Sequence, residues 1–178
     1  MQKIKIQCPA KINLDLKVVN KREDGYHNIE STMQTIDLYD YLTISAEDSS
    51  VIEINLSGNS PEIPYNENNL VYKAAKLYLE TCNLTKRINV EIEKNIPISA
   101  GLAGGSTDAA GVIFGLNKLY SGVLTMDELH NLCAKLGSDL NVCLNGGCLK
   151  TFGRGEIIKP VEFKKMKVNL IKPLNLGI

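Results

Sequence analysis

A glycine-rich segment over residues 97–110 has residue types and spacing that could bind a phosphate group. Gly101, Gly104 and Gly105 fall within five positions, and Ser106 and Thr107 follow directly. Glycine tolerates positive φ and lets the backbone approach a ligand closely. A strand is expected before the segment and a helix after it, so the two hydroxyls fall at a helix N-terminus, which attracts phosphate. The spacing matches neither Walker A nor GxGxxG, so a tight turn with a Ser/Thr cap stays open as the alternative.

Other polar residues have types and spacings that could form a substrate-binding or catalytic site. Lys11 and Asn13 lie two apart in an alternating segment, so they share one strand face. Tyr26 and His27 follow an Asp-Gly turn, and Asp139 follows a Gly-Ser pair. Residue type alone leaves ordinary alternatives open, namely a solvated strand face, an exposed aromatic pair and a turn carboxylate.

These motifs together resemble a known family. The pattern Pro-x-x-x-Gly-Leu-x-Gly-Gly-Ser-Thr-x-Ala-Ala over 97–110 resembles the ATP-binding motif of the galactokinase, homoserine kinase, mevalonate kinase and phosphomevalonate kinase (GHMP) superfamily. The runs Pro9–Leu14, Asp24–His27 and Leu136–Asp139 are similar to those of 4-diphosphocytidyl-2-C-methyl-D-erythritol kinases. The resemblance extends from about residue 3 to the last residue, in the family's order.

The resemblance implies a phosphoryl transfer and assigns residues to it. ATP, with Mg²⁺, would phosphorylate the 2-hydroxyl of 4-diphosphocytidyl-2-C-methyl-D-erythritol in the non-mevalonate isoprenoid pathway. Asp139 would be the general base, and Lys11 would stabilise the transferring phosphoryl group. Asn13 would hydrogen-bond the substrate, with Tyr26 stacking on its cytosine and His27 bonding the base edge.

The resemblance also implies a nucleotide site around the glycine-rich loop. Ser106 would in addition be a ligand to Mg²⁺. The implied ATP-binding residues are Pro97, Ile98, Ser99, Ala100, Gly101, Leu102, Ala103, Gly104, Gly105, Ser106 and Thr107, together with Asn69 and Lys94.

The sequence departs from the family pattern in two ways. Family members usually follow the catalytic Asp with Val-Pro and a Phe, whereas this chain has Leu140-Asn141-Val142. Family chains also continue well beyond 178 residues. We therefore expect residues 1–160 to form the amino-terminal GHMP domain and residues 161–178 to begin a carboxyl-terminal domain that is otherwise missing. Three alternatives stay open: an inactive nucleotide-binding fragment, another GHMP small-molecule kinase, or a non-enzymatic assembly module.

The elements that must position these residues form a mixed α+β pattern. Apolar periodicity changes between two and 3.6 residues without regular βα alternation. The expected strands are 3–6, 12–18, 39–46 paired with 51–57, 87–94, 148–152 and 167–171. The expected helices are 69–82, 105–119 and one from a Thr125/Glu128 capping box to near Gly137, with a turn at 21–25 and a loop at 58–68. The resemblance adds a ribosomal protein S5 domain 2-like mixed sheet with packed helices.

The composition disfavours nucleic-acid-binding, membrane-spanning and zinc-binding proteins. The chain has 178 residues, 20 Lys+Arg against 20 Asp+Glu, a net charge of zero and a pI near 6.7. Such a chain is a poor general nucleic-acid binder, and no apolar run is long enough to cross a bilayer. Five cysteines without a CxxC pair disfavour a zinc site and indicate reduced thiols. We therefore expect a bacterial cytoplasmic protein, monomeric or weakly dimeric, acting on a small molecule.

Overall fold

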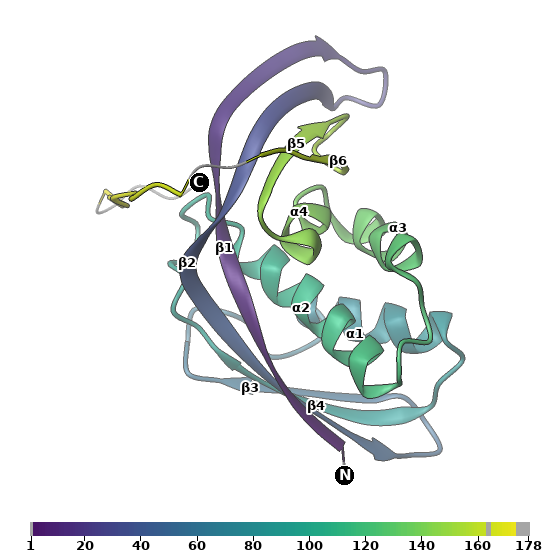
Figure 1. Ribbon diagram of the computed structural model, residues 1–178. Helices are drawn as coiled ribbons and strands as arrows, with labels where there is room; N and C mark the ends of the chain where they lie inside the picture. The colour runs from purple at the N-terminus through teal and green to yellow at the C-terminus, as the bar shows by residue number, and fades with distance from the viewer. Residues whose placement is uncertain (1, 163–164, 174–178) are drawn as a thin grey trace.

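A long curved hairpin dominates the computed structural model, which describes residues 2–162 and 165–173. The hairpin consists of β1 (Gln2–Lys21) and β2 (His27–Asp48), which pair antiparallel around the expected Asp24-Gly25 turn. Three irregularities in the register, between Pro9 and Lys11, Asn13 and Asp15, and Val18 and Asn20, interrupt the pairing. Bulges of this kind bend a strand, and Figure 1 shows the hairpin curving along the whole molecule.

Four shorter strands complete one mixed sheet. They are β3 (Glu53–Gly58), β4 (Lys86–Glu93), β5 (Cys148–Phe152) and β6 (Ile157–Pro160). The order is β3-β4-β2-β5-β6, with β1 on β2. β3 and β4 run parallel, and the other pairs are antiparallel. The expected α+β architecture is confirmed.

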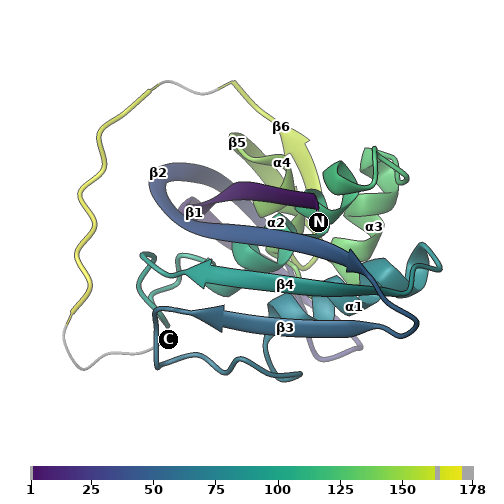
Figure 2. The ribbon, with the colours of Figure 1, turned by 90° about the horizontal axis from the view of Figure 1, so that it is seen from below.

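Two strand predictions are wrong in part. Segments 39–46 and 51–57 do form strands, but they do not pair, because β4 lies between β2 and β3. The reason is burial: Ile88, Ile92 and Val90 of β4 are 0–1% exposed, so β4 takes the central position and β3 the edge. Residues 167–171 form no strand. They are exposed, and Figure 2 shows them outside the sheet. Residues 167–170 line a cavity with residues 34–38 of β2, but no ladder pairs the two segments in the described chain.

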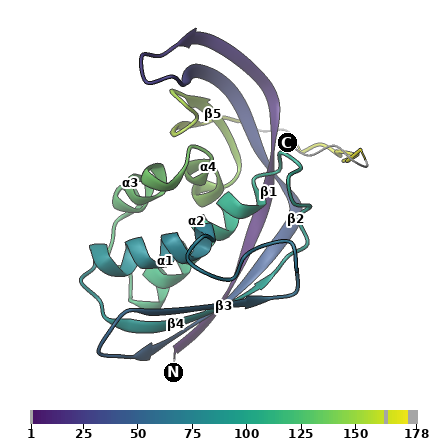
Figure 3. The same cartoon turned by 180° about the vertical axis from the view of Figure 1, so that it is seen from behind.

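The helices cover one face of the sheet, as Figure 3 shows. They are α1 (Leu70–Thr81), α2 (Gly104–Leu119), α3 (Met126–Leu136) and α4 (Leu140–Asn145). Asn69 caps α1, and the expected Thr125/Glu128 capping box of α3 is confirmed. The short helix α4 is not predicted from the sequence, since six residues are too few to show a helical period. None of the helices in the described ranges is long and apolar enough to span a membrane.

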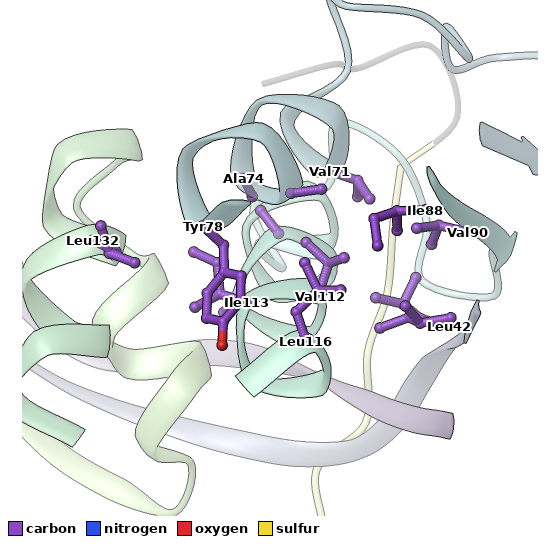
Figure 4. Close-up of a cluster of buried hydrophobic side chains, with 14 of the residues drawn as sticks. Leu42, Val71, Ala74, Tyr78, Ile88, Val90, Val112, Ile113, Leu116 and Leu132 are labelled. Carbon is purple, nitrogen blue, oxygen red and sulfur yellow. The ribbon is translucent and has the colours of Figure 1, made fainter. Parts of the chain in front are cut away.

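The core lies between these helices and the part of the sheet that contains β4 and the second half of β2. Figure 4 shows side chains of α1, α2, β2 and β4 meeting there, among them Tyr78, Leu116, Leu42 and Ile88. Glycines bring α2 close to the sheet: a Cβ at Gly111 would lie 2.4 Å from the Sγ of Cys8. We call this region, built from β3, β4, residues 2–9 of β1, residues 39–48 of β2, α1 and α2, the body. We call residues 14–33, the far half of the hairpin, the arm.

Candidate active site

The glycine-rich loop is a turned segment that leads into α2. Ser99, Gly101 and Ala103 have φ values of 52°, 70° and 58°, so three alternate residues lie in the left-handed region. Ala103 is the N-cap residue of α2, and no described side chain caps that helix. The first amides of α2 are therefore left to another partner, which is the arrangement that binds anions at helix N-termini.

A cavity of about 350 Å³ lies over this loop. Every expected ATP-binding loop residue from Pro97 to Gly105 lines it, as do Asn69, Lys94 and Asp108. Ser106 and Thr107, in the first turn of α2, do not line it. Thr107 is 1% exposed and lines a separate cavity instead. The structure thus gathers most of the expected nucleotide residues around the cavity and leaves both hydroxyl residues, Ser106 and Thr107, outside its lining.

Lys94 is held in a buried ion triad beneath the cavity. Its Nζ lies 2.8 Å from Oδ2 of Asp108 and also pairs with Oδ2 of Asp40. Asp40 is fully buried, and its Oδ1 accepts hydrogen bonds from the backbone N–H groups of Asn95 and Ile96 at 2.6 and 2.8 Å. The triad therefore fixes the residues that enter the loop. The sequence did not single out Asp40, because nothing local distinguishes it from Asp37 and the other carboxylates of β2.

Burial and charge act in opposite directions on these groups. Burial raises the pKa of Asp108 to about 7, although Lys94 opposes the rise. Burial lowers the pKa of Lys94, but the carboxylates of Asp108 and Asp40 outweigh it, and the net result is a raised pKa. The ammonium therefore stays charged, and Asp108 is the group whose charge changes near neutral pH.

Asn69 lines the same cavity but already uses its amide. Its Oδ1 accepts from the N–H of Val71 at 2.9 Å, and its Nδ2 donates to the carbonyl of Pro64 at 2.6 Å. The side chain therefore joins the loop before α1 to the helix, and its expected contact with nucleotide would add to this structural role.

Lys11 and Asp139, 128 positions apart in the sequence, meet in space. Nζ of Lys11 lies 3.2 Å from Oδ2 of Asp139. Nζ also donates to Oδ1 of Asn13 at 2.8 Å, and Nδ2 of Asn13 donates to Oγ of Ser31 at 2.9 Å. Lys11 is nearly buried, whereas the side chain of Asp139 is 32% exposed. The carboxylate can therefore reach a ligand while the ammonium fixes its place.

The backbone joins this pair to the glycine-rich loop. Lys11 lies beside a register shift of β1, and its N–H donates to the carbonyl of Leu102 at 3.1 Å. A residue in a regular ladder would spend that N–H on its neighbouring strand, so the irregularity is what lets β1 bond the loop. Lys11 consequently lies between the cavity at the glycine-rich loop and Asp139.

Asp139 is held by packing although the family's proline is absent. It is the N-cap residue of α4, in right-handed helical geometry. Leu140 and Val142 are fully buried, and Nδ2 of Asn141 donates to the carbonyl of Glu156 at 2.7 Å. These contacts fix the first turn of α4, so the departure from Val-Pro does not leave the carboxylate loosely placed.

Tyr26 and His27 lie at the tip of the arm and are exposed. The Tyr26 side chain is 57% exposed, and its backbone N–H donates to Oδ1 of Asp24 at 3.1 Å. The guanidinium of Arg154 lies over the Tyr26 ring, 5.2 Å from its centroid. Sequence reasoning missed Arg154, although Gly-Arg-Gly in a chain with only three arginines was a usable signal.

No metal centre is built from side chains in the described ranges. No three His, Cys, Asp or Glu side chains gather there, and the five cysteines are free thiols. Mg²⁺ in nucleotide enzymes is held largely by phosphate oxygens and waters, with one or two protein ligands. The partly exposed hydroxyl of Ser106 in the first turn of α2 suits such a limited part.

Comparison with known proteins supports the family and the fold expected from the motifs. Residues 69–148 match the model of the GHMP kinases N terminal domain. A 4-diphosphocytidyl-2-C-methyl-D-erythritol kinase of Clostridium beijerinckii is 45% identical over 96% of this chain and 60% of the relative. One of Bacillus cereus is 48% identical over 90% of this chain and 55% of the relative.

Solved structures show the same likeness. A crystal structure of 4-(cytidine 5'-diphospho)-2C-methyl-D-erythritol kinase matches with a TM-score of 0.74 and 35% identity, over 90% of this chain and 56% of that one. A mevalonate kinase of Methanococcus jannaschii matches with a TM-score of 0.67 at 18% identity, over 91% and 56%, which speaks for the fold alone. The resemblance and fold expected from the motifs are confirmed, and the chain spans about 60% of the curated relatives it matches.

Proposed function

The chain carries a GHMP kinase N-terminal domain, and from this premise we propose that it serves the ATP-dependent phosphorylation of the 2-hydroxyl of 4-diphosphocytidyl-2-C-methyl-D-erythritol. The observation that supports this best is the ion pair of Lys11 and Asp139, 3.2 Å apart, bonded through the Lys11 backbone to the glycine-rich loop. The pair combines a partly exposed base with a nearby cation, next to a cavity suited to phosphates.

The chemistry needs one proton transfer and one phosphoryl transfer. Oδ2 of Asp139 accepts the proton of the substrate's 2-hydroxyl while that oxygen attacks the γ-phosphorus. The new O–P bond forms as the bond to the β-phosphate oxygen breaks, and ADP leaves. Nζ of Lys11 stabilises the charge on the transferring group, and Asn13 orients the hydroxyl.

ATP is the phosphoryl donor in this proposal. Residues 97–105 surround its phosphates with backbone amides, and Lys94 and Asn69 contact the nucleotide from the cavity wall. Ser106 would be a ligand to Mg²⁺, which would supply positive charge to the phosphates when bound. Thr107 contributes only if the first turn of α2 opens, since its side chain is buried.

Tyr26 and His27 would hold the cytosine end of the substrate. The exposed ring of Tyr26 offers a stacking face, and the His27 imidazole can hydrogen-bond the base edge. Residues 1–160 form the amino-terminal domain in this proposal; the second domain expected from residue 161 lies partly outside the described residues. The protein works in the bacterial cytoplasm as a monomer or weak dimer.

Turnover tests the proposal directly. The purified chain is incubated with Mg-ATP and 4-diphosphocytidyl-2-C-methyl-D-erythritol, and ADP release is followed. Asp139→Asn should lower the rate about 10²- to 10⁴-fold, the usual worth of a general base. The matched control is Asp127→Asn, an exposed carboxylate in the first turn of α3, which should leave the rate unchanged.

The rival functions predict different outcomes. Binding of ATP without turnover favours an inactive nucleotide-binding fragment. Turnover of homoserine or mevalonate, without any response to cytidine nucleotides, favours another GHMP kinase. Full activity of Asp139→Asn would refute the role given to the ion pair.

A further inference from the structure

A second charged group stands beside the arm, outside the nucleotide cavity. The turn between β5 and β6 carries Arg154, whose guanidinium carbon lies 5.2 Å from the centroid of the Tyr26 ring. The Arg154 side chain is about one-third exposed, and Tyr26 is 57% exposed. A cation on one face of an aromatic ring leaves the other face for stacking.

The backbone of this turn is well anchored. Gly153 and Gly155 have φ values of 69° and 115°, where a side chain would be strained. The N–H of Arg154 donates to Oε2 of Glu156 at 2.7 Å, and the carbonyl of Gly153 accepts from the N–H of Ile29 in β2 at 2.7 Å. The turn is thus fixed within itself and to the arm.

The same turn reaches the reacting end of the site. A Cβ placed on Gly155 would lie 3.5 Å from Cβ of Ser138, the residue before Asp139. The carbonyl of Glu156 accepts from Nδ2 of Asn141 in the first turn of α4. One short segment therefore contacts both the arm near Tyr26 and the helix that carries Asp139.

The guanidinium keeps its donors for a ligand. The described residues give it one weak partner, Oε1 of Glu156, 3.9 Å from Nε, and no side-chain hydrogen bond. Its positive charge is also one of the contributions that lower the pKa of Asp24, although burial opposes them. An arginine fork with unused N–H groups is suited to bidentate binding of phosphate.

We propose that Arg154 binds the phosphates of a pyrimidine nucleoside diphosphate whose base stacks on the open face of Tyr26. This rests on the proposed function and adds a specificity residue to it. Gly153, Gly155 and the Glu156 carboxylate fix the Arg154 backbone. In this proposal Arg154 lies between Tyr26, where the base of the ligand binds, and Asp139, where the reacting hydroxyl binds. The arginine thus acts on the substrate's anionic link, apart from the ATP phosphates at the glycine-rich loop.

The test compares two ligands that share the nucleoside and differ in the diphosphate group. Binding of CDP and of uncharged cytidine to the 178-residue chain is measured by NMR titration, for the wild type, Arg154→Gln and Arg154→Lys. Arg154→Gln should weaken CDP binding about 10- to 100-fold, as expected for lost charge-assisted hydrogen bonds, and cytidine binding less than about twofold. Arg154→Lys should recover part of the CDP affinity, because it keeps the charge but not the fork.

A matched control removes the same charge nearby. Lys159→Gln, on the exposed face of β6, should leave both affinities unchanged. Equal losses for CDP and cytidine in Arg154→Gln would show that Arg154 only supports Tyr26, and unchanged CDP affinity would exclude any role; either result overturns the inference while the kinase proposal stands. If the wild-type chain binds neither ligand, the inference fails for this chain, while ADP release in the turnover assay judges the kinase independently.

Discussion

The body and the arm differ in how completely their apolar side chains are covered. In the body, Leu42 and Ile88 are 0% exposed, because α1 and α2 lie over the sheet there. In the arm, Leu16 and Val18 are 60% and 58% exposed. β1 and β2 run through both regions, so strand propensity does not make the difference. The difference lies in what packs against each half of the hairpin.

This contrast separates the two ends of the site. The glycine-rich loop rises from the body, next to a buried ion triad and a complete core. Tyr26 stands on the arm, where the neighbouring core is a small cluster of Met33, Val142 and Leu149. We expect the nucleotide end to be the more rigid, because its backbone is fixed by buried groups on several elements.

The largest effect should come from breaking the triad in the body. Lys94→Met removes the ammonium group of the triad and leaves the carboxyl groups of Asp40 and Asp108 buried side by side. Loss of one partner of a buried pair costs about 3–5 kcal/mol, so the free energy of unfolding in urea should fall by about that much. Lys73→Met, on the exposed side of α1, is the control and should change it by less than about 0.5 kcal/mol. A loss below about 1 kcal/mol for Lys94→Met would show that these charges are hydrated rather than paired.

A core truncation compares the two regions by the same chemistry. Leu42→Ala in the body should lower the free energy of unfolding by about 2–5 kcal/mol, through lost burial and a residual cavity. Leu16→Ala in the arm should lower it by less than about 1 kcal/mol, since that side chain is already mostly in water. Both values come from urea denaturation. Equal losses would mean that the arm is as well packed as the body, contrary to the comparison.

The sequence predicts local structure well where the pattern is local. The α1 cap at Asn69, the capping box at Thr125 and the turn at Gly25 all follow from short-range rules. The insertion of β4 between β2 and β3 does not follow from such rules. The order of strands depends on which strand is most buried in the folded sheet, and that is a property of the whole fold. Periodicity likewise predicts a strand at 167–171 but cannot tell whether a partner strand pairs with it, and none does in the described chain.

The candidate site shows the same division. Motif resemblance identified Lys11 and Asp139, and the structure brings them together at 3.2 Å. It did not identify Asp40 or Arg154, because the role of each depends on a contact between residues far apart in the sequence. Asp40 contacts Lys94, and Arg154 contacts Tyr26.

Between pH 4.5 and 7.5, the pH dependence of stability should report chiefly on the body, because the lowered pKa values of Asp15 and Asp24 place the titration of these arm carboxylates below this range. The pKa of Asp108 is raised from its ordinary value of 3.8 to about 7, chiefly by burial, despite Lys94 nearby. The folded state therefore binds this proton more tightly than the unfolded state. The contribution is fully present below about pH 4 and is lost as the pH rises to about 7 and above, at a slope of at most about 1.4 kcal/mol per pH unit.

Substitution isolates this carboxyl from the others. Urea denaturation between pH 4.5 and 7.5 should show the decline in the wild type and a flatter profile in Asp108→Asn. Asp48→Asn is the control, because the lowered pKa of Asp48, due chiefly to its hydrogen bond with Lys86, places its titration below this window. Identical slopes for the wild type and Asp108→Asn would show that Asp108 is ionised throughout.

The smallest effect on stability is expected on the arm, where it sharpens the comparison most. Val18→Thr keeps the shape and β-branching of a 58% exposed side chain and changes only its polarity. The free energy of unfolding should change by less than about 0.5 kcal/mol, because little apolar area is buried there. Exposed apolar surface does favour association, so sedimentation velocity should show weaker self-association than in the wild type. Val51→Thr, 55% exposed but away from the arm, is the control for a general gain in polarity. If Val18→Thr cost more than about 1.5 kcal/mol, the arm face would have to be buried in the folded chain, and the distinction between arm and body would fail.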